Sequence, residues 1–328
     1  MKHLLCSLLG CLLLSLNTAS AQKVWSFDKK KPLLSDDGKS LLNLYTVKQM
    51  PEFVMGLHGK ALRTDGYSTW IDTTVDEGFS SLSGWFALES YPTDTAAFMG
   101  IRDVLGTSIA VCTDRFGELL LGIGKDSLYS YYSLKTKVEC FEWLHLLLDL
   151  ESKSVYLNGC KITPAVWVEL LLDNRTFVQV GKDFRNKKVW MYDVTAINGL
   201  IDEINISSAS LDLAALEANF ISNQKKTPIL AIPQTRFAKD FNRPHYHLLP
   251  SANWTNETHG LIHYKGKYHI FNQKNASAIF LGQIHWGHFS SPDLIHWTEE
   301  KPALTPDATY DKNGIWSGCA VINDSGIP

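Results

Sequence analysis

The segment at residues 254–260 (WTNETHG) holds the side chains of this chain that are best suited to chemistry. One carboxylate, Glu257, stands there among amide, hydroxyl and imidazole groups, just before a strand-like stretch. A carboxylate can attack a sugar carbon and form a covalent intermediate. Without further context, a solvated turn is the more usual role for such a carboxylate, so its meaning depends on the elements around it.

The residues after this segment predict a small antiparallel sheet. Alternating apolar and polar residues separated by turn signals predict strands at 260–264, 268–273, 284–290 and 295–298, the first two joined by a turn at 265–267. Four consecutive antiparallel strands, with Glu257 at the head of the first, are typical of one blade of a β-propeller.

The sequence motifs of this region also resemble those of a known family. The runs WTNETHG, YKGKYHIFNQKN, GQIHWGHFSSPDLIHW and WSGCAV follow one another in this chain. In that order they resemble the start of the glycoside hydrolase family 32 domain. The resemblance implies a five-bladed propeller that cleaves β-fructofuranosides with retention, acting on sucrose, levan or inulin.

The resemblance also implies roles for individual residues. The family's WMNDPNG motif falls on WTNETHG, so its nucleophilic Asp corresponds to Glu257 and the adjoining Asn to Asn256. Its substrate-binding Gln corresponds to Gln273. Its Phe-Ser pair corresponds to Trp316 and Ser317. Asn256 and Gln273 would then hold sugar hydroxyls, while Trp316 and Ser317 would shape the pocket wall.

Three departures from the family pattern leave the sugar open. Glu257 replaces an Asp, Thr258-His259 replaces Pro-Asn, and Leu281 replaces a Trp. A Glu is one methylene longer, and retaining glycosidases hold their two carboxyl groups only about 5–5.5 Å apart. The pocket must differ accordingly, so a hydrolase of another sugar, such as an arabinose-containing glycan, stays an alternative.

The family's transition-state stabiliser (Arg-Asp-Pro) and general acid (Glu-Cys) belong to later blades and have no counterpart before Pro328. We therefore expect this chain to be the front part of a longer protein, with a truncated propeller. A natural end at Pro328 would exclude hydrolysis by this polypeptide and favour a third function, a non-catalytic carbohydrate-binding protein.

The preceding residues predict a different all-β unit. A basic start, a leucine-rich run and a small-x-small site predict a signal peptide at 1–21, cleaved after Ala21. Short strand-like runs over 22–222 predict a sandwich, closed by a helix at 211–218. The sequences of these runs resemble those of concanavalin-like (laminin-G type) domains. A polar linker at 223–242 would separate it from the partial propeller at 243–328.

The amino-acid composition limits the classes of binding partner that we expect. A net charge of −3 with 20 % charged residues does not favour nucleic acid or an anionic membrane as a partner. No apolar run of membrane length follows the signal, so we expect an exported, soluble protein whose partner is an oligo- or polysaccharide.

Metals and disulfides are minor alternatives. No cofactor is expected, although four carboxylates of the first unit could be calcium ligands rather than turn or strand residues: Asp65, Asp72, Asp202 and Glu203. The histidines between His245 and His296 are better explained as strand residues than as a metal site. Of the mature cysteines, Cys112, Cys140 and Cys160 could supply one disulfide or remain thiols, and Cys319 is expected to be a small core residue.

Overall fold

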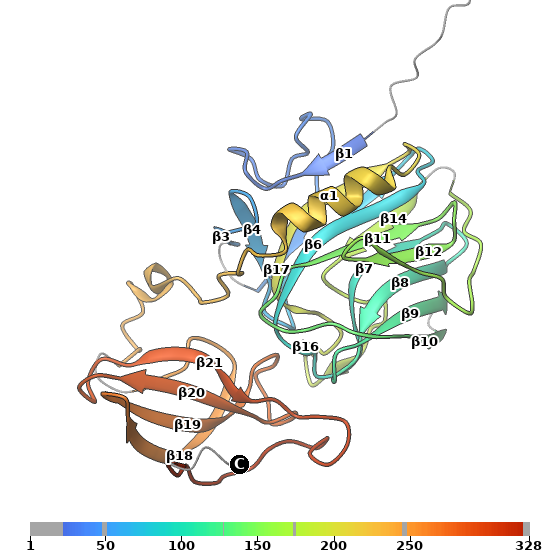
Figure 1. The fold of residues 1–328 in the computed structure, drawn as a ribbon. Coiled ribbons are helices and arrows are strands. Elements are labelled where there is room, and N and C mark those ends of the chain that lie inside the picture. The colour runs from blue at the N-terminus through green and yellow to red at the C-terminus, as the bar shows by residue number, and fades with distance from the viewer. Residues whose placement is uncertain (1–21, 48–50, 127, 173–174, 245–247, 324–328) are drawn as a thin grey trace, which may run out of the picture.

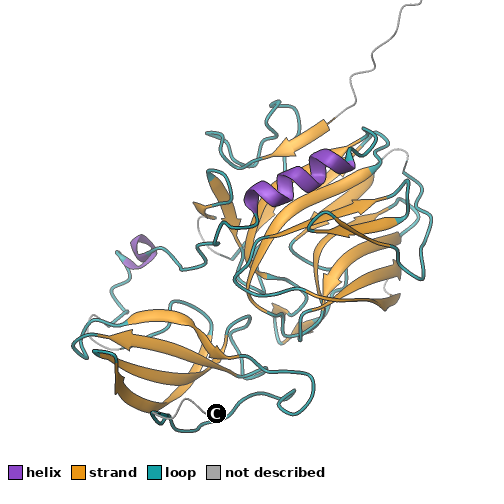
Figure 2. Cartoon of the chain, in the orientation of Figure 1, coloured by secondary structure: helices purple, strands orange, loops and turns teal. Residues whose placement is uncertain are grey.

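The computed structural model describes residues 22–47, 51–126, 128–172, 175–244 and 248–323 (Figure 1). The predicted signal peptide at 1–21, and His245 and His247, lie outside these residues. Figure 2 shows that strands dominate the described chain and that helix is rare, as the all-β prediction requires.

Two large antiparallel sheets form the first part of the chain. The eight-stranded sheet has the order β13-β12-β11-β6-β17-β4-β3, with β1 also paired to β17; its strands are β1 (Gln22–Trp25), β3 (Glu52–Met55), β4 (Lys60–Arg63), β6 (Ser81–Ser90), β11 (Leu144–Asp149), β12 (Ser154–Leu157), β13 (Cys160–Ile162) and β17 (Asn198–Ser207). The seven-stranded sheet has the order β10-β9-β8-β7-β14-β5-β2; its strands are β2 (Asn43–Tyr45), β5 (Trp70–Val75), β7 (Ala96–Arg102), β8 (Thr107–Thr113), β9 (Glu118–Lys125), β10 (Leu128–Lys137) and β14 (Thr176–Val180). A short ribbon pairs β15 (Lys188–Val189) with β16 (Tyr192–Asp193).

The two sheets pack face to face because their strands alternate. On β6, Leu82, Phe86 and Leu88 enter the main hydrophobic core, whereas the intervening side chains point to the other face. Phe86 meets Phe98 of the opposite sheet edge-on, with ring centroids 5.3 Å apart. The predicted sandwich is therefore confirmed as an architecture, while its concanavalin-like assignment and its boundaries at 22 and 222 stay predictions.

One helix covers the outer face of the eight-stranded sheet (Figure 1). α1 (Leu213–Asn223) begins where Asp212 accepts a hydrogen bond from the backbone N–H of Ala215 at 3.0 Å, an N-cap. Phe220 of this helix stacks on Trp85 of β6 at 6.3 Å. The helix predicted at 211–218 is present, but it begins two residues later and continues five residues further.

A four-stranded antiparallel sheet follows the short 3₁₀ helix η1 (Gln234–Phe237). Its order is β18-β19-β20-β21, with β18 (Trp254–Tyr264), β19 (Lys267–Asn275), β20 (His285–Ser291) and β21 (Thr298–Leu304). The predicted succession of four neighbouring strands, typical of a propeller blade, is confirmed.

The fourth strand was predicted at the wrong place. Residues 295–297 form a bend instead, because the Asp293 carboxylate accepts hydrogen bonds from the backbone N–H groups of Ile295 at 2.9 Å and His296 at 2.8 Å. Pairing with β20 then begins only at Thr298.

The sandwich and the four-stranded sheet share a buried polar contact. Lys274 on β19 is only 4 % exposed and lies between two carboxylates, 3.5 Å from Glu89 of β6 and 2.6 Å from Glu299 of β21. Burial alone would lower the pKa of Lys274, but Glu89 and Glu299 raise it above its ordinary value. Arg63 of β4 pairs with Glu89 from the other side. The loop after β19 adds uncharged hydrogen bonds, one of which joins Ser277 to Ser90 at 2.6 Å.

Local contacts bear on the alternatives considered for metals and disulfides. Cys112, Cys140, Cys160 and Cys319 are free thiols, so the disulfide considered for the first unit is not formed, and Cys319 is exposed rather than a core residue. Three of the four carboxylates weighed as calcium ligands accept protein hydrogen bonds: Asp65 from the backbone of Ser68 and Thr69, Asp72 from Asn43, and Asp202 from Leu57. Glu203, the fourth, lies 3.8 Å from His58. These contacts match the turn and strand alternative.

Within the described residues, no helix has the length and apolarity needed to cross a membrane.

Replacing Glu89 by Gln should destabilise the protein, because Lys274 and Arg63 would lose a shared counter-ion in a poorly solvated place. Breaking one partner of such a buried arrangement costs about 3 kcal/mol of unfolding free energy. Denaturant unfolding followed by tryptophan fluorescence measures the effect.

The matched control is Glu169→Gln, since Glu169 pairs with Lys153 on the surface, where both side chains are at least half exposed. Such a pair contributes only about 0–1 kcal/mol. Equal unfolding midpoints for the two variants would show that the buried contact does not hold the two parts together.

Candidate active site

Gln273 of β19 is the centre of a hydrogen-bond network at one face of the four-stranded sheet. Its side chain is only 2 % exposed. The amide oxygen accepts a hydrogen bond from Asn256 Nδ2 at 3.0 Å, and the amide nitrogen donates to Glu257 Oε1 at 3.2 Å and to Ser317 Oγ at 2.8 Å. The Ser317 hydroxyl in turn donates to the same Glu257 oxygen. The structure thus brings four of the five predicted site residues into one network.

A β-bulge explains why two neighbouring residues of β18 reach one amide. Thr255 pairs with Lys274 and Thr258 pairs with Asn272, so Asn256 and Glu257 together face the single residue Gln273. A bulge of this kind re-aims side chains and often occurs beside active sites. The expectation that Glu257 precedes the first strand is therefore wrong: it lies inside β18.

A second bulge follows in the same strand. Between the pairs His259–Phe271 and Ile262–His269 the register shifts again. Gly260 lies there with a φ of 63°, in the left-handed region that glycine adopts most readily. A Cβ atom at this position would lie 3.0 Å from the Phe271 ring, so the strand bends where only glycine fits well.

Ser317 reaches the network from a segment that is not a strand. Residues 314–322 were predicted as the first strand of a second blade, but the described part of the chain provides no ladder partner for them. Two hydrogen bonds hold the segment against the sheet instead: Ile315 N donates to the Ile284 carbonyl at 2.8 Å, and Trp286 Nε1 donates to the Trp316 carbonyl at 2.7 Å. The Trp316 side chain is 58 % exposed and takes no part in the network.

Trp286 is a site residue that the sequence analysis missed. Besides holding the Trp316 backbone, its indole contacts the His259 ring edge-on at 4.4 Å and the Phe271 ring at 5.5 Å. Burial lowers the pKa of His259, although the nearby Glu257 carboxylate acts in the opposite direction. Trp286 belongs to the HWGH motif of β20, which contributed to the family resemblance. None of the residues of this motif was predicted to be a site residue.

The arrangement presents one carboxylate to the surface with its position fixed. Two uncharged donors converge on Glu257 Oε1, and the Glu257 side chain is otherwise exposed. A carboxylate held in this way is suited to nucleophilic attack on an electrophilic carbon. None of the hydrogen bonds in the network comes from a second carboxylate of the described residues.

Three histidines of this sheet contact each other or the backbone through their ring nitrogens. His269 Nδ1 lies 3.0 Å from His288 Nε2, and His285 Nδ1 lies 2.7 Å from the Gln283 carbonyl. Across the part of the chain that the structure describes, no group of three His, Cys, Asp or Glu side chains is placed to hold a metal ion.

Comparisons with known proteins match this part of the chain. The family described as "Glycosyl hydrolases family 32 N-terminal domain" matches residues 247–327. Raffinose invertase of Escherichia coli is 44 % identical over 81 residues, which cover 25 % of this chain and 17 % of that protein. "Beta-fructofuranosidase, insoluble isoenzyme 3" of Oryza sativa subsp. indica is 43 % identical over 86 residues, covering 26 % and 15 %. Sucrose-6-phosphate hydrolase of Escherichia coli is 45 % identical over 84 residues, covering 26 % and 17 %.

These similarities support the predicted resemblance to glycoside hydrolase family 32 for the last quarter of the chain. The chain spans no more than 17 % of the length of these three relatives. The concanavalin-like resemblance of the preceding part stays a prediction.

The buried His285 predicts how stability responds to acid. Because a carbonyl only accepts, Nδ1 carries the proton in the bond to Gln283, and burial lowers the pKa of the ring from 6.5 to about 4. The unfolded chain therefore takes up a proton at a higher pH than the folded one, so stability is lost as the pH falls from about 6.5 to 4. His285→Gln should flatten this decline, which for one such group amounts to roughly 3 kcal/mol.

Urea unfolding at several pH values between 7 and 4 measures the slope. The exposed His263→Gln variant of β18 should decline in parallel with the unmodified protein. If His285→Gln also declines in parallel, burial of a neutral ring at this position does not cause the acid sensitivity.

Proposed function

We propose that the complete protein is a glycoside hydrolase of the β-fructosidase type, which releases fructosyl units from β-fructofuranosides with retention. One observation carries the proposal: Glu257 Oε1 accepts hydrogen bonds from Gln273 and Ser317, and all three residues lie within the segment that matches the family 32 N-terminal domain. The relatives named as raffinose invertase, β-fructofuranosidase and sucrose-6-phosphate hydrolase support fructosides as the substrate class.

Double displacement is the mechanism that we infer. The Glu257 carboxylate forms a bond to the anomeric carbon of a terminal fructosyl unit while the bond to the leaving oxygen breaks. An acid outside the described network protonates that oxygen. Water then attacks the same carbon and gives its proton to the conjugate base of that acid. The bond from this carbon to the Glu257 carboxylate breaks, and fructose leaves with its original configuration.

The other site residues position the carboxylate or contact the sugar. Gln273 and Ser317 fix Glu257 through Oε1, which leaves the exposed side of the carboxylate for attack. Asn256, an exposed member of the network, would contact hydroxyl groups of the sugar. The exposed Trp316 side chain, which lies outside the network, would contact an apolar ring face. Because Glu257 is longer than the Asp of the family, another sugar such as an arabinose-containing glycan remains an alternative substrate.

A second candidate function is carbohydrate binding without turnover. It is favoured by the single carboxylate in the network, since retaining hydrolysis needs two. The two candidates differ in one measurable property, the release of free sugar.

Glu257→Gln in the complete polypeptide encoded by the gene should reduce fructose release by roughly 10³-fold or more, because an amide cannot form the ester intermediate. Sugar release from sucrose, raffinose, inulin, levan and arabinan measures activity and separates the substrate classes.

Glu300→Gln is the matched control on the same sheet. Glu300 accepts a hydrogen bond from Ser290 at 2.6 Å and lies outside the Gln273 network, so activity should persist. Unchanged turnover by Glu257→Gln would remove Glu257 from the mechanism. Binding of these sugars by the unmodified protein without any turnover would favour the second candidate.

We also propose export, because residues 1–21 have the layout of a signal peptide. The mature protein recovered from its source should therefore begin at Gln22 by mass spectrometry of its N-terminal peptide. A protein that retains Met1 would contradict cleavage.

A further inference from the structure

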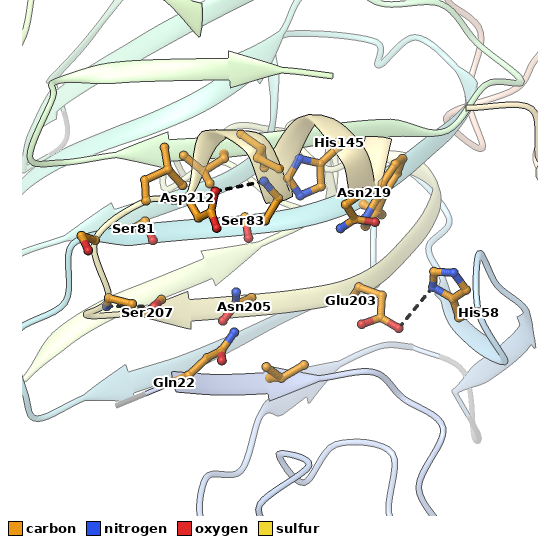
Figure 3. A pocket seen from close by; sticks show the side chains of 18 residues that line it. Gln22, His58, Ser81, Ser83, His145, Glu203, Asn205, Ser207, Asp212 and Asn219 are labelled. Atoms are coloured by element: carbon orange, nitrogen blue, oxygen red, sulfur yellow. Dashed lines mark hydrogen bonds and ion pairs between the residues drawn. The ribbon is translucent and has the colours of Figure 1, made fainter. Parts of the chain in front are cut away.

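A cavity of about 400 Å³ lies between α1 and the outer face of the eight-stranded sheet (Figure 3). Side chains from β1, β6, β11, β17 and α1 line it. Its volume falls within the ~300–1,000 Å³ typical of small-molecule pockets. The cavity belongs to the sandwich and shares no lining residue with the Gln273 network.

Small polar side chains create the space. Outward-facing positions of β6 carry Ser81 and Ser83, and those of β17 carry Asn205 and Ser207, as Figure 3 shows. A sheet face that a helix covers is normally filled by large apolar side chains. Here the serines stop short of the helix, so the space between them stays open.

Polar atoms along this cavity lack partners within the protein. His145 of β11 is only 5 % exposed, and no group of the described residues bonds its Nδ1 atom; the Oδ1 atom of Asn205 is likewise without a partner. Buried polar atoms are nearly always hydrogen-bonded, so the wall of this cavity contains two polar atoms whose hydrogen-bonding capacity the described residues leave unused. Burial lowers the pKa of His145 to about 4, so at neutral pH its ring can both donate and accept.

A β-bulge adds a further polar group. The pairing of β17 with β6 shifts between Asp202 and Asn205, and Glu203 within the bulge has a φ of 49°. A left-handed glutamate is an uncommon, unfavourable conformation. The bulge places the Glu203 side chain at the rim, 3.8 Å from His58 (Figure 3).

The charges at the cavity exclude an anionic ligand. The two lining carboxylates are Glu203, beside His58, and Asp212, which caps α1; no lysine or arginine is among the described lining residues. A phosphate or carboxylate ligand would find no cationic partner there. The apolar part of the wall comes from Trp85, Leu147 and Leu216.

We propose that this cavity is a carbohydrate-binding site that takes a neutral sugar unit at the end of an oligosaccharide. Sugar hydroxyls both donate and accept, which matches His145, Asn205 and the serines, and a sugar's C–H face matches the apolar wall. Such a site would hold the protein on a glycan independently of hydrolysis at Glu257, so the proposal does not rest on the proposed function.

Hydrogen-exchange mass spectrometry of the Glu257→Gln variant tests the site without turnover. The neutral probes are inulin-derived fructotriose, raffinose and maltotriose, and the anionic probe is sialyllactose. At least one neutral probe should slow exchange in peptides covering 81–90, 144–149 and 213–223, whereas sialyllactose should not.

Two variants at one position provide the control. Ser83→Leu fills the space. The probe concentration that gives half of the full protection should therefore rise at least about tenfold. Ser83→Ala adds no volume, but it removes the hydroxyl and should weaken protection by a smaller factor. Neither variant should alter any protection of peptides covering 254–264.

Three results would overturn the proposal. They are no protection by any neutral probe, which would mean that the cavity holds only water; equal protection by sialyllactose; or protection that a folded Ser83→Leu variant retains in full. Thermal unfolding of each variant establishes that it is folded.

Discussion

The alternation of side chains along β19 is the constraint on which the rest of the structure depends. Successive residues of a strand point to opposite faces, so Gln273 and Lys274 must face different environments. Gln273 points to the face where it binds Asn256, Glu257 and Ser317. Lys274 points to the sandwich, where it meets Glu89, and to Glu299 of its own sheet. One strand therefore links the candidate active site to the first part of the chain.

This link is a reason to regard the sandwich as more than a tethered neighbour. A buried lysine requires compensating charge, and one of its two counter-ions comes from β6 of the sandwich. If Lys274 lost that partner, a buried charge on the strand that carries Gln273 would keep only Glu299 as a counter-ion. The geometry of the network is thus supported from behind by residues that never contact a substrate.

Sequence reasoning succeeded where short-range patterns decide the structure. The hairpin around residues 265–267 and the strands of the sandwich follow from alternation and turn residues, which act locally. The prediction from sequence failed where pairing between strands overrides the intrinsic strand propensity of the residues. Asn256 and Glu257 are poor strand formers and were placed before a strand, but pairing with β19 includes them as a bulge. Residues 295–298 look like a strand, yet the Asp293 carboxylate holds their start in a turn.

Other features could not be predicted because no local signal exists for them. Glu89 and Lys274 lie 185 positions apart in the sequence, and nothing near either residue indicates a partner. The cavity beneath α1 depends in the same way on serines of two strands that are far apart in the sequence, and no local pattern marks these serines as cavity residues. The identity of Gln273 and Ser317 as neighbours of Glu257 came instead from the family resemblance, and their contacts agree with it.

A nucleophilic carboxylate must carry the sugar covalently for part of each turnover. The most direct measurement is therefore peptide mapping by mass spectrometry after rapid acid quenching of the complete polypeptide during turnover of a fructoside. The expected result is one fructosyl unit attached to Glu257 in the peptide that spans 254–264. Turnover with this peptide unmodified, and the sugar attached to another residue, would contradict the role assigned to Glu257.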